Sequence, residues 1–96
     1  MEIRWLRKAL HNLDREATYI AKDDPAAAST VVQRIHAAVG LLSENPALGH
    51  PGRIDGTREL VIPDTRYIVP YRVMPQLNRV EILRVFHASR KLPESW

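Results

Sequence analysis

The chain of 96 residues contains no cysteine and only three lysines. The absence of cysteine excludes disulfides and thiolate metal sites, which suits a reducing compartment. All apolar runs are far shorter than the roughly 20 residues that a membrane-spanning helix needs. The N-terminal stretch MEIRWLRKAL also lacks the hydrophobic segment of a secretion signal. We therefore expect a cytoplasmic protein that makes no membrane contact.

Hydrophobic residues make up 45% of the chain, which is enough for a packed core. A chain of this length holds one such core, so we expect residues 1–96 to form a single domain.

The net charge of +3 is unevenly distributed. Residues 1–51 carry six basic and six acidic side chains, whereas residues 52–96 carry eight and five. Guanidinium groups bind phosphates and carboxylates through two parallel hydrogen bonds, which lysine cannot reproduce. The C-terminal half therefore suggests an anionic partner, although a solvated sheet face explains the same charge. Its arginines are Arg53, Arg58, Arg66, Arg72, Arg79, Arg84 and Arg90.

Two segments in the first half have the spacing of amphipathic helices, with apolar residues every three to four positions. The first stripe consists of Leu6, Leu10, Leu13, Ala17 and Ile20. Asp24 and Pro25 mark the start of a second helix, because Asp caps free amides and Pro suits the first turn. Its stripe consists of Ala28, Val31, Val32, Ile35, Val39 and Leu42. Two helices with so short a connection predict a helical hairpin.

The second half changes to a strand pattern. The stretch NPALGHPGRIDG contains two prolines and three glycines and is predicted to be a loop. Strands are expected at residues 2–5, 58–62, 66–73 and 79–87, the last three as an antiparallel meander. Pro70 cannot donate a ladder hydrogen bond, so we expect a β-bulge there. The predicted fold is α+β, in the order β-αα-βββ, with the hairpin packed on a small, mainly antiparallel sheet.

His87 lies in the stretch LRVFHASRKL, between Arg84 and Arg90, and is the centre of the candidate site. Three roles are open for this histidine: it takes part in a reaction, it forms part of a docking surface, or it only ends a core strand. The four histidines lack the short spacing of metal ligands, so no metal is expected. Trp5, Tyr67 and Tyr71 suit core packing better than base stacking. The glycine-rich loop lacks a phosphate-loop lysine, and no cofactor is expected.

Six stretches, in order from Ile3 to Pro93, resemble the ParE/RelE superfamily of bacterial type II toxin–antitoxin toxins, also labelled plasmid stabilisation proteins. They are IRW, YIAKDDPAAA, ENPALGHPGR, GTRELVI, YIVPYRV and VEILRVFHASRKLP. The resemblance implies the same β-αα-βββ fold. It also implies a partner, the cognate antitoxin encoded alongside, which wraps the toxin in a hetero-oligomer.

The superfamily contains two activity classes. RelE-like members cleave messenger RNA on the ribosome without metal, which needs a base, an acid and cations at the phosphate. His87 would be the acid, and Arg66 and Arg84, with Arg58, the stabilising cations. The base is missing, because no lysine lies between residues 43 and 85 and the loop has Gly52 and Arg53 where family members place a glutamate. Asp55 and Glu59 match no family motif.

ParE-like members bind and inhibit DNA gyrase, and they also end in an RVxH sequence, here residues 84–87. Because the acid–base set is incomplete, we expect a gyrase-binding toxin without catalytic residues of its own. The expected target-binding residues are Arg58, Arg66, Arg84, His87 and Arg90, together with the C-terminal segment. The alternatives are a metal-independent messenger RNA endonuclease that acts with the ribosome, and an inactive remnant that still binds its antitoxin.

Overall fold

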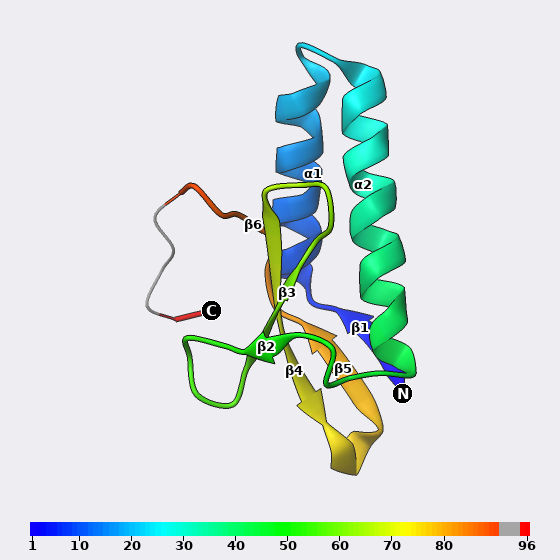
Figure 1. Ribbon diagram of the computed structural model, residues 1–96, viewed down its shortest axis with the longest axis vertical. Helices are drawn as coiled ribbons and strands as arrows, with labels where there is room; N and C mark the ends of the chain where they lie inside the picture. Colours follow the sequence, from blue (N-terminus) through cyan, green and yellow to red (C-terminus); the bar gives the residue numbers. More distant parts are fainter. Residues whose placement is uncertain (91–94) are drawn as a thin grey trace.

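The computed structural model describes residues 1–90 and 95–96, and it consists of a helical hairpin beside a twisted sheet (Figure 1). The two helices are α1 (Arg7–Ala21) and α2 (Pro25–Gly40), and two short 3-10 helices follow at Leu41–Ser43 and Pro75–Leu77. The strands are β1 (Glu2–Trp5), β2 (His50–Pro51), β3 (Arg58–Val61), β4 (Tyr67–Met74), β5 (Arg79–Ile82) and β6 (Phe86–His87). None of the helices in these residues is both long and apolar enough to cross a membrane.

The sheet has the order β1-β5-β4-β3-β2, and β6 pairs with the start of β4. Every pair is antiparallel except β1 with β5, which is parallel. The predicted α+β class, the helical hairpin and the mainly antiparallel sheet are therefore confirmed. The structure adds the two-residue strand β2, which lies within the stretch predicted to be a loop.

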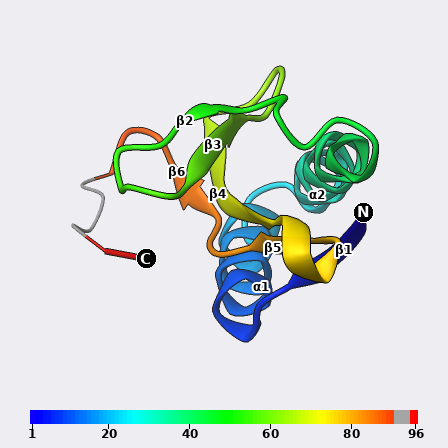
Figure 2. The same ribbon diagram turned by 90° about the horizontal axis from the view of Figure 1, so that it is seen from below.

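The helical hairpin covers one face of the sheet, and no helix of the described residues lies on the other face (Figure 2). The core between the two layers is formed by Ala9, Leu13, Ile35, Val39, Leu42, Leu60, Val69, Tyr71, Val80 and Ile82. At the start of α2, the Asp24 carboxylate accepts a hydrogen bond from the Ala27 amide at 3.0 Å, with Pro25 at the first helical position. This is the predicted helix cap.

The buried side of α1 differs from the predicted stripe. Leu10 is 49% exposed, whereas Ala9 is fully buried. The face that meets the sheet runs through Ala9, Leu13 and Ile20, so the expectation that Leu10 belongs to it was wrong. A small alanine at this position lets the helix approach the strands closely, which periodicity alone did not indicate.

The predicted third strand is interrupted opposite Pro70. Tyr71 pairs with Ile82 and Ile68 pairs with Phe86, so the two residues between them on β4 face three residues, 83–85, on the other strand. One extra residue on one strand is a β-bulge. Pro70 accepts a hydrogen bond from the Leu83 amide at 2.9 Å, and the bulge lies on the side where its missing N–H would point. The expected bulge is therefore present, on the partner strand.

Candidate functional site

His87 ends β6 and lies opposite Tyr67 of β4, with the two ring centroids 5.2 Å apart and the rings nearly perpendicular. Its Nδ1 atom accepts a hydrogen bond from the Ser89 amide at 3.3 Å and lies 2.6 Å from the Ser89 hydroxyl. Because the amide can only donate, Nδ1 is an acceptor, and the proton of the neutral imidazole sits on Nε2. The turn after β6 thus fixes both the orientation and the tautomer of His87.

Glu16 of α1 joins the two elements that carry this site. Its carboxylate accepts hydrogen bonds from the Tyr67 hydroxyl at 3.0 Å and from Nη1 of Arg90 at 2.7 Å. Burial, followed by the charge of Glu16, raises the pKa of Tyr67 to about 12. The hydrogen bond to Glu16 likewise raises the pKa of Arg90. The turn after β6 is therefore held against α1 through one carboxylate.

Glu16 was not singled out in the sequence, although a signal was present. It lies three residues after Leu13 and four before Ile20, which is the spacing of the apolar stripe itself. An acid within that stripe needs a hydrogen-bonding partner when it is buried. In the structure Tyr67 and Arg90 supply that partner.

Arg66 directly precedes β4 and Arg84 lies two residues before β6, and the two side chains differ in their surroundings. The Arg66 side chain is exposed, and it makes no hydrogen bond or ion pair with the described residues. Its carbonyl accepts the Ala88 amide, which places it beside the turn that holds His87. Arg84 is half-buried, donates from Nε to the Asn12 side chain at 2.8 Å and lies over the Phe86 ring.

Arg58 lies apart from the other candidates. It pairs with Tyr71, four residues along β4 from Tyr67, which corresponds to about 13 Å of strand. Its guanidinium donates to the carbonyls of Gly49 and Ala47 at 2.7 and 3.4 Å. Arg58 thus braces the loop before β2, while Arg66, His87 and Arg90 gather around the β6 end of the sheet.

The same loop is also held by Tyr71, whose hydroxyl donates to the Pro46 carbonyl at 2.7 Å and accepts the Gly49 amide at 2.9 Å. A Cβ atom at Gly49 would lie only 2.8 Å from the Tyr71 ring, so only glycine fits here. Tyr71 is fully buried and Tyr67 nearly so, which agrees with the core role expected for these aromatic residues.

Neither of the two acids weighed as a substitute base lies at His87. Glu59 is 2% exposed and accepts three hydrogen bonds from the backbone and side chain of Arg53. Burial alone would raise the pKa of Glu59, but the Arg53 contacts outweigh it and lower the pKa below its ordinary value. Asp55 is exposed in the loop between β2 and β3. Lys91 lies outside the described residues, as do the other members of the segment 91–94.

Several arginines of the C-terminal half are engaged with carboxylates. Arg53 pairs with Glu59, Arg72 with Glu81, Arg79 with Glu2 and Glu81, and Arg90 with Glu16. Two of these acids, Glu59 and Glu81, are buried on the sheet face opposite the helices. Much of the positive charge in this half is therefore neutralised within the fold.

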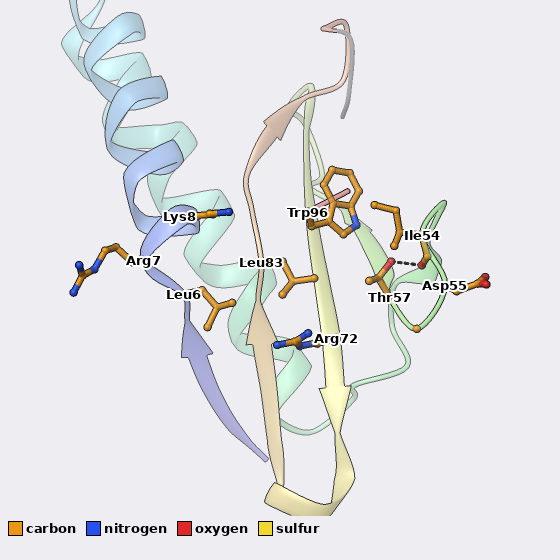
Figure 3. A pocket seen from close by; sticks show the side chains of 10 residues that line it. Leu6, Arg7, Lys8, Ile54, Asp55, Thr57, Arg72, Leu83 and Trp96 are labelled. Atoms are coloured by element: carbon orange, nitrogen blue, oxygen red, sulfur yellow. Dashed lines mark hydrogen bonds between the residues drawn. The ribbon is translucent and has the colours of Figure 1, made fainter. Parts of the chain in front are cut away.

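A second group of cations, unnoticed in the sequence, lies along α1. A groove of about 380 Å³ is lined by Arg7, Lys8, His11, Asn12, Arg15 and Arg84. A neighbouring groove of about 620 Å³ begins at Arg7 and Lys8 and reaches Arg72 and Trp96 across β5 (Figure 3). In Figure 3 Lys8 extends from α1 toward β5, whereas Arg7 points away from it. The helical spacing of residues 7, 8, 11 and 15 was the signal that could have revealed this stripe.

The four histidines lie on different elements. The His36 ring packs at a tilt against Trp5, His50 lies at the sheet edge, and His11 lies on α1. In residues 1–90 and 95–96 no three His, Cys, Asp or Glu side chains are grouped so that they could hold a metal ion.

Comparisons with known proteins agree with this architecture. Residues 3–92 match the family model described as "ParE toxin of type II toxin-antitoxin system, parDE". The chain is 53% identical over 92 residues to "Putative toxin Y4kP" of Sinorhizobium fredii, covering 96% of this chain and 93% of that protein.

Solved structures give the same result. The structure of the chromosomal ParDE toxin–antitoxin system from P. aeruginosa matches with a TM-score of 0.80 and 29% identity, over 93% of this chain and 97% of that one. The RelBE2 toxin–antitoxin complex from Mycobacterium tuberculosis matches less closely, with a TM-score of 0.59 and 28% identity over 92% of each chain. The resemblance inferred from the sequence is confirmed: the chain belongs to the ParE toxin family of type II toxin–antitoxin systems.

Proposed function

We propose that this toxin arrests growth by binding and inhibiting DNA gyrase, without cutting nucleic acid, until a cognate antitoxin neutralises it. The proposed contact surface is formed by Arg66, His87 and Arg90, with Arg84 beside them. Arg58 supports this surface indirectly, since it braces the loop at the other end of β4.

One observation carries the choice of a binder: no unoccupied general base faces His87 among the described residues. The carboxylate that lies nearest in the hydrogen-bond network, Glu16, is held by Tyr67 and Arg90. Cleavage of RNA by its own 2′-hydroxyl needs a base that can accept the hydroxyl proton. A surface that only binds needs fixed charge and shape, which the anchored Arg90 and the exposed Arg66 supply.

An antitoxin partner is supported by exposed apolar side chains elsewhere on the molecule. Leu41, Leu48 and Val61 are 61%, 44% and 56% exposed and line one groove of about 400 Å³ between the end of α2 and β3. Apolar side chains that gather in one exposed groove mark a surface that a protein covers. The solved relatives are themselves toxin–antitoxin systems, which agrees with a partner encoded alongside.

A supercoiling assay tests the proposal. Purified toxin in excess should block gyrase, and Arg66→Ala should weaken the block at least tenfold, because its exposed side chain is lost without disturbing the fold. Arg4→Ala is the matched control, since this equally exposed arginine lies on β1 at the far edge of the sheet. Gyrase that stays fully active with excess wild-type toxin would rule the proposal out.

Messenger RNA cleavage on the ribosome is the second candidate, and the orientation of His87 favours it. Because the Ser89 turn engages Nδ1, the Nε2 atom of a protonated His87 is left to donate to a leaving oxygen, with Arg66 and Arg84 as the cations that stabilise the phosphate. Primer extension on translated RNA discriminates: codon-phased cuts that disappear in His87→Ala would replace the gyrase proposal with this one.

An inactive remnant that only binds antitoxin is the third candidate. Expression of the toxin alone should arrest growth if either active candidate is correct. Normal growth with soluble toxin present would leave only the remnant.

A further inference from the structure

The cationic groove on α1 lies outside the surface around His87 that is proposed to contact gyrase. Four permanent cations, Arg7, Lys8, Arg15 and Arg84, line it with His11, and the lining contains no carboxylate. None of these four forms an ion pair with any residue in the described parts of the chain, in contrast to Arg53, Arg72, Arg79 and Arg90. A row of cations with no carboxylate in the groove lining creates a positive potential that suits an external anion.

The spacing along α1 suits a polymer rather than a single anion. Arg7 and Arg15 are eight residues apart, which spans about 12 Å of helix. Duplex DNA presents one phosphate per 3.4 Å on each strand, so about three or four phosphates of one strand lie within that length. Arg84, held by Asn12 at 2.8 Å, extends the line from α1 to the bulge after β5.

The groove is suited to a nucleic-acid backbone rather than to unpaired bases. Sequence-independent binders of single strands stack bases on exposed aromatic side chains. No Phe, Tyr or Trp side chain of the described residues lines this groove, and the nearby Phe86 ring contacts Arg84 and Trp96. Fixed cations without stacking platforms are typical of surfaces that grip the outer backbone of a duplex.

We propose that the groove formed by Arg7, Lys8, His11, Arg15 and Arg84 binds the phosphate backbone of duplex DNA. The choice of duplex DNA rests on the proposed function, because gyrase holds such a segment and the toxin would contact enzyme and DNA together. The binding of phosphate itself rests only on the groove.

The salt dependence of DNA binding tests this directly, without gyrase. The full chain is titrated into a short fluorescent duplex at several salt concentrations, and log K is plotted against log salt concentration. Four phosphate contacts predict a slope of about −3.6. The double variant Lys8→Gln/Arg15→Gln should make this slope less negative by about 2 units. The charge-conserving variant Lys8→Arg/Arg15→Lys should leave the slope unchanged.

The matched control is Lys22→Gln/Arg34→Gln, which likewise removes one lysine and one arginine from exposed positions outside the groove, at the end of α1 and on α2. It should change the slope by less than half of the change expected for Lys8→Gln/Arg15→Gln. Equal losses in both double variants, or a wild-type slope shallower than about −1, would overturn the inference. So would tighter binding of single-stranded RNA, or of polyglutamate with the same number of charges, at the same salt concentration.

Gyrase inhibition and phosphate binding by the groove can each be disproved without the other. The supercoiling assay reports on gyrase inhibition, and the salt slope reports on the groove. A toxin that leaves gyrase active but retains the slope and its loss in Lys8→Gln/Arg15→Gln would keep the groove assignment and remove the gyrase one. Thermal unfolding of each variant verifies that the fold is intact.

Discussion

Two cationic regions of this toxin differ in what their charges face. On the outer sheet face, Arg53 and Arg72 are hydrogen-bonded to the buried carboxylates of Glu59 and Glu81. Along α1, Arg7, Lys8 and Arg15 are exposed and have no acidic partner in the described structure. The first region uses its charge to hold the fold together, whereas the second leaves it available for binding.

This difference changes the meaning of the charge distribution along the chain. Counting charges by segment assigns the whole excess of +3 to residues 52–96 and none to residues 1–51. In the folded protein, carboxylates from both halves neutralise the C-terminal arginines, as Glu16 and Glu2 do for Arg90 and Arg79. The unpaired cations of α1 therefore belong to the segment that looked neutral.

The largest expected effect is the loss of stability when a paired arginine is removed. Arg53→Ala leaves the Glu59 carboxylate buried with no cation, and we expect a loss of about 2–3 kcal/mol in the free energy of unfolding. Urea denaturation measures this. The control is Arg4→Ala, whose partner Glu2 is exposed, with an expected loss below about 0.5 kcal/mol.

The pH dependence of that loss identifies its cause. Because the folded protein lowers the pKa of Glu59, the Arg53 contact stabilises the fold above the ordinary glutamate pKa of about 4.3. This stabilisation disappears as the pH falls through the lowered value. The difference between wild type and Arg53→Ala should therefore shrink in acid, and a difference that is constant from neutral pH down to strong acid would contradict the ion-pair explanation.

A smaller effect is expected where Glu16 joins α1 to the β6 end. Tyr67→Phe removes the hydroxyl that donates to Glu16, and we expect a loss of about 1–2 kcal/mol. The pKa of Tyr67 is raised to about 12 from 10. Its stabilisation is complete below pH 10, where unfolded tyrosine is still protonated, and is lost as the pH rises toward 12.

The difference in stability between wild type and Tyr67→Phe should therefore narrow over this alkaline range. Phenolate absorbance of the folded protein gives a second measurement, because the Tyr67 hydroxyl should titrate late, near pH 12. Burial raises the pKa of Tyr71 as well, so Tyr67→Phe identifies which late step belongs to Tyr67. Tyr19→Phe is the control and should leave the late step in place. The absence of a step near pH 12 would contradict the Glu16 contact.

The fold could be predicted from the sequence because its signals are local. Helical periodicity, the cap at Asp24 and the missing N–H of Pro70 each indicate an element or an irregularity without knowledge of the tertiary structure. The parallel pairing of β1 with β5 and the small helix–sheet contact at Ala9 depend on packing between distant segments. No spacing rule within one element indicates them.

The candidate site was predicted only in part for the same reason. His87 and Arg90 were singled out within one motif and Arg66 at the start of another predicted strand, and the backbone hydrogen bond from Ala88 to Arg66 brings these segments side by side. Glu16, which anchors Arg90, lies 74 residues away in the sequence. Whether an arginine is paired depends on such distant carboxylates, so the division between structural and available cations became visible only in the folded chain.

The smallest expected effect on stability is at the α1 groove, in contrast to the paired arginines of the outer sheet face. Lys8→Gln/Arg15→Gln should change the free energy of unfolding by no more than about 0.5 kcal/mol, since neither side chain has an acidic partner to lose. Arg72→Gln, which leaves the buried Glu81 with a single arginine, should cost about 1 kcal/mol in the same urea experiment. If the groove variant were the less stable of the two, its cations would be structural as well, and the distinction between the two regions would not hold.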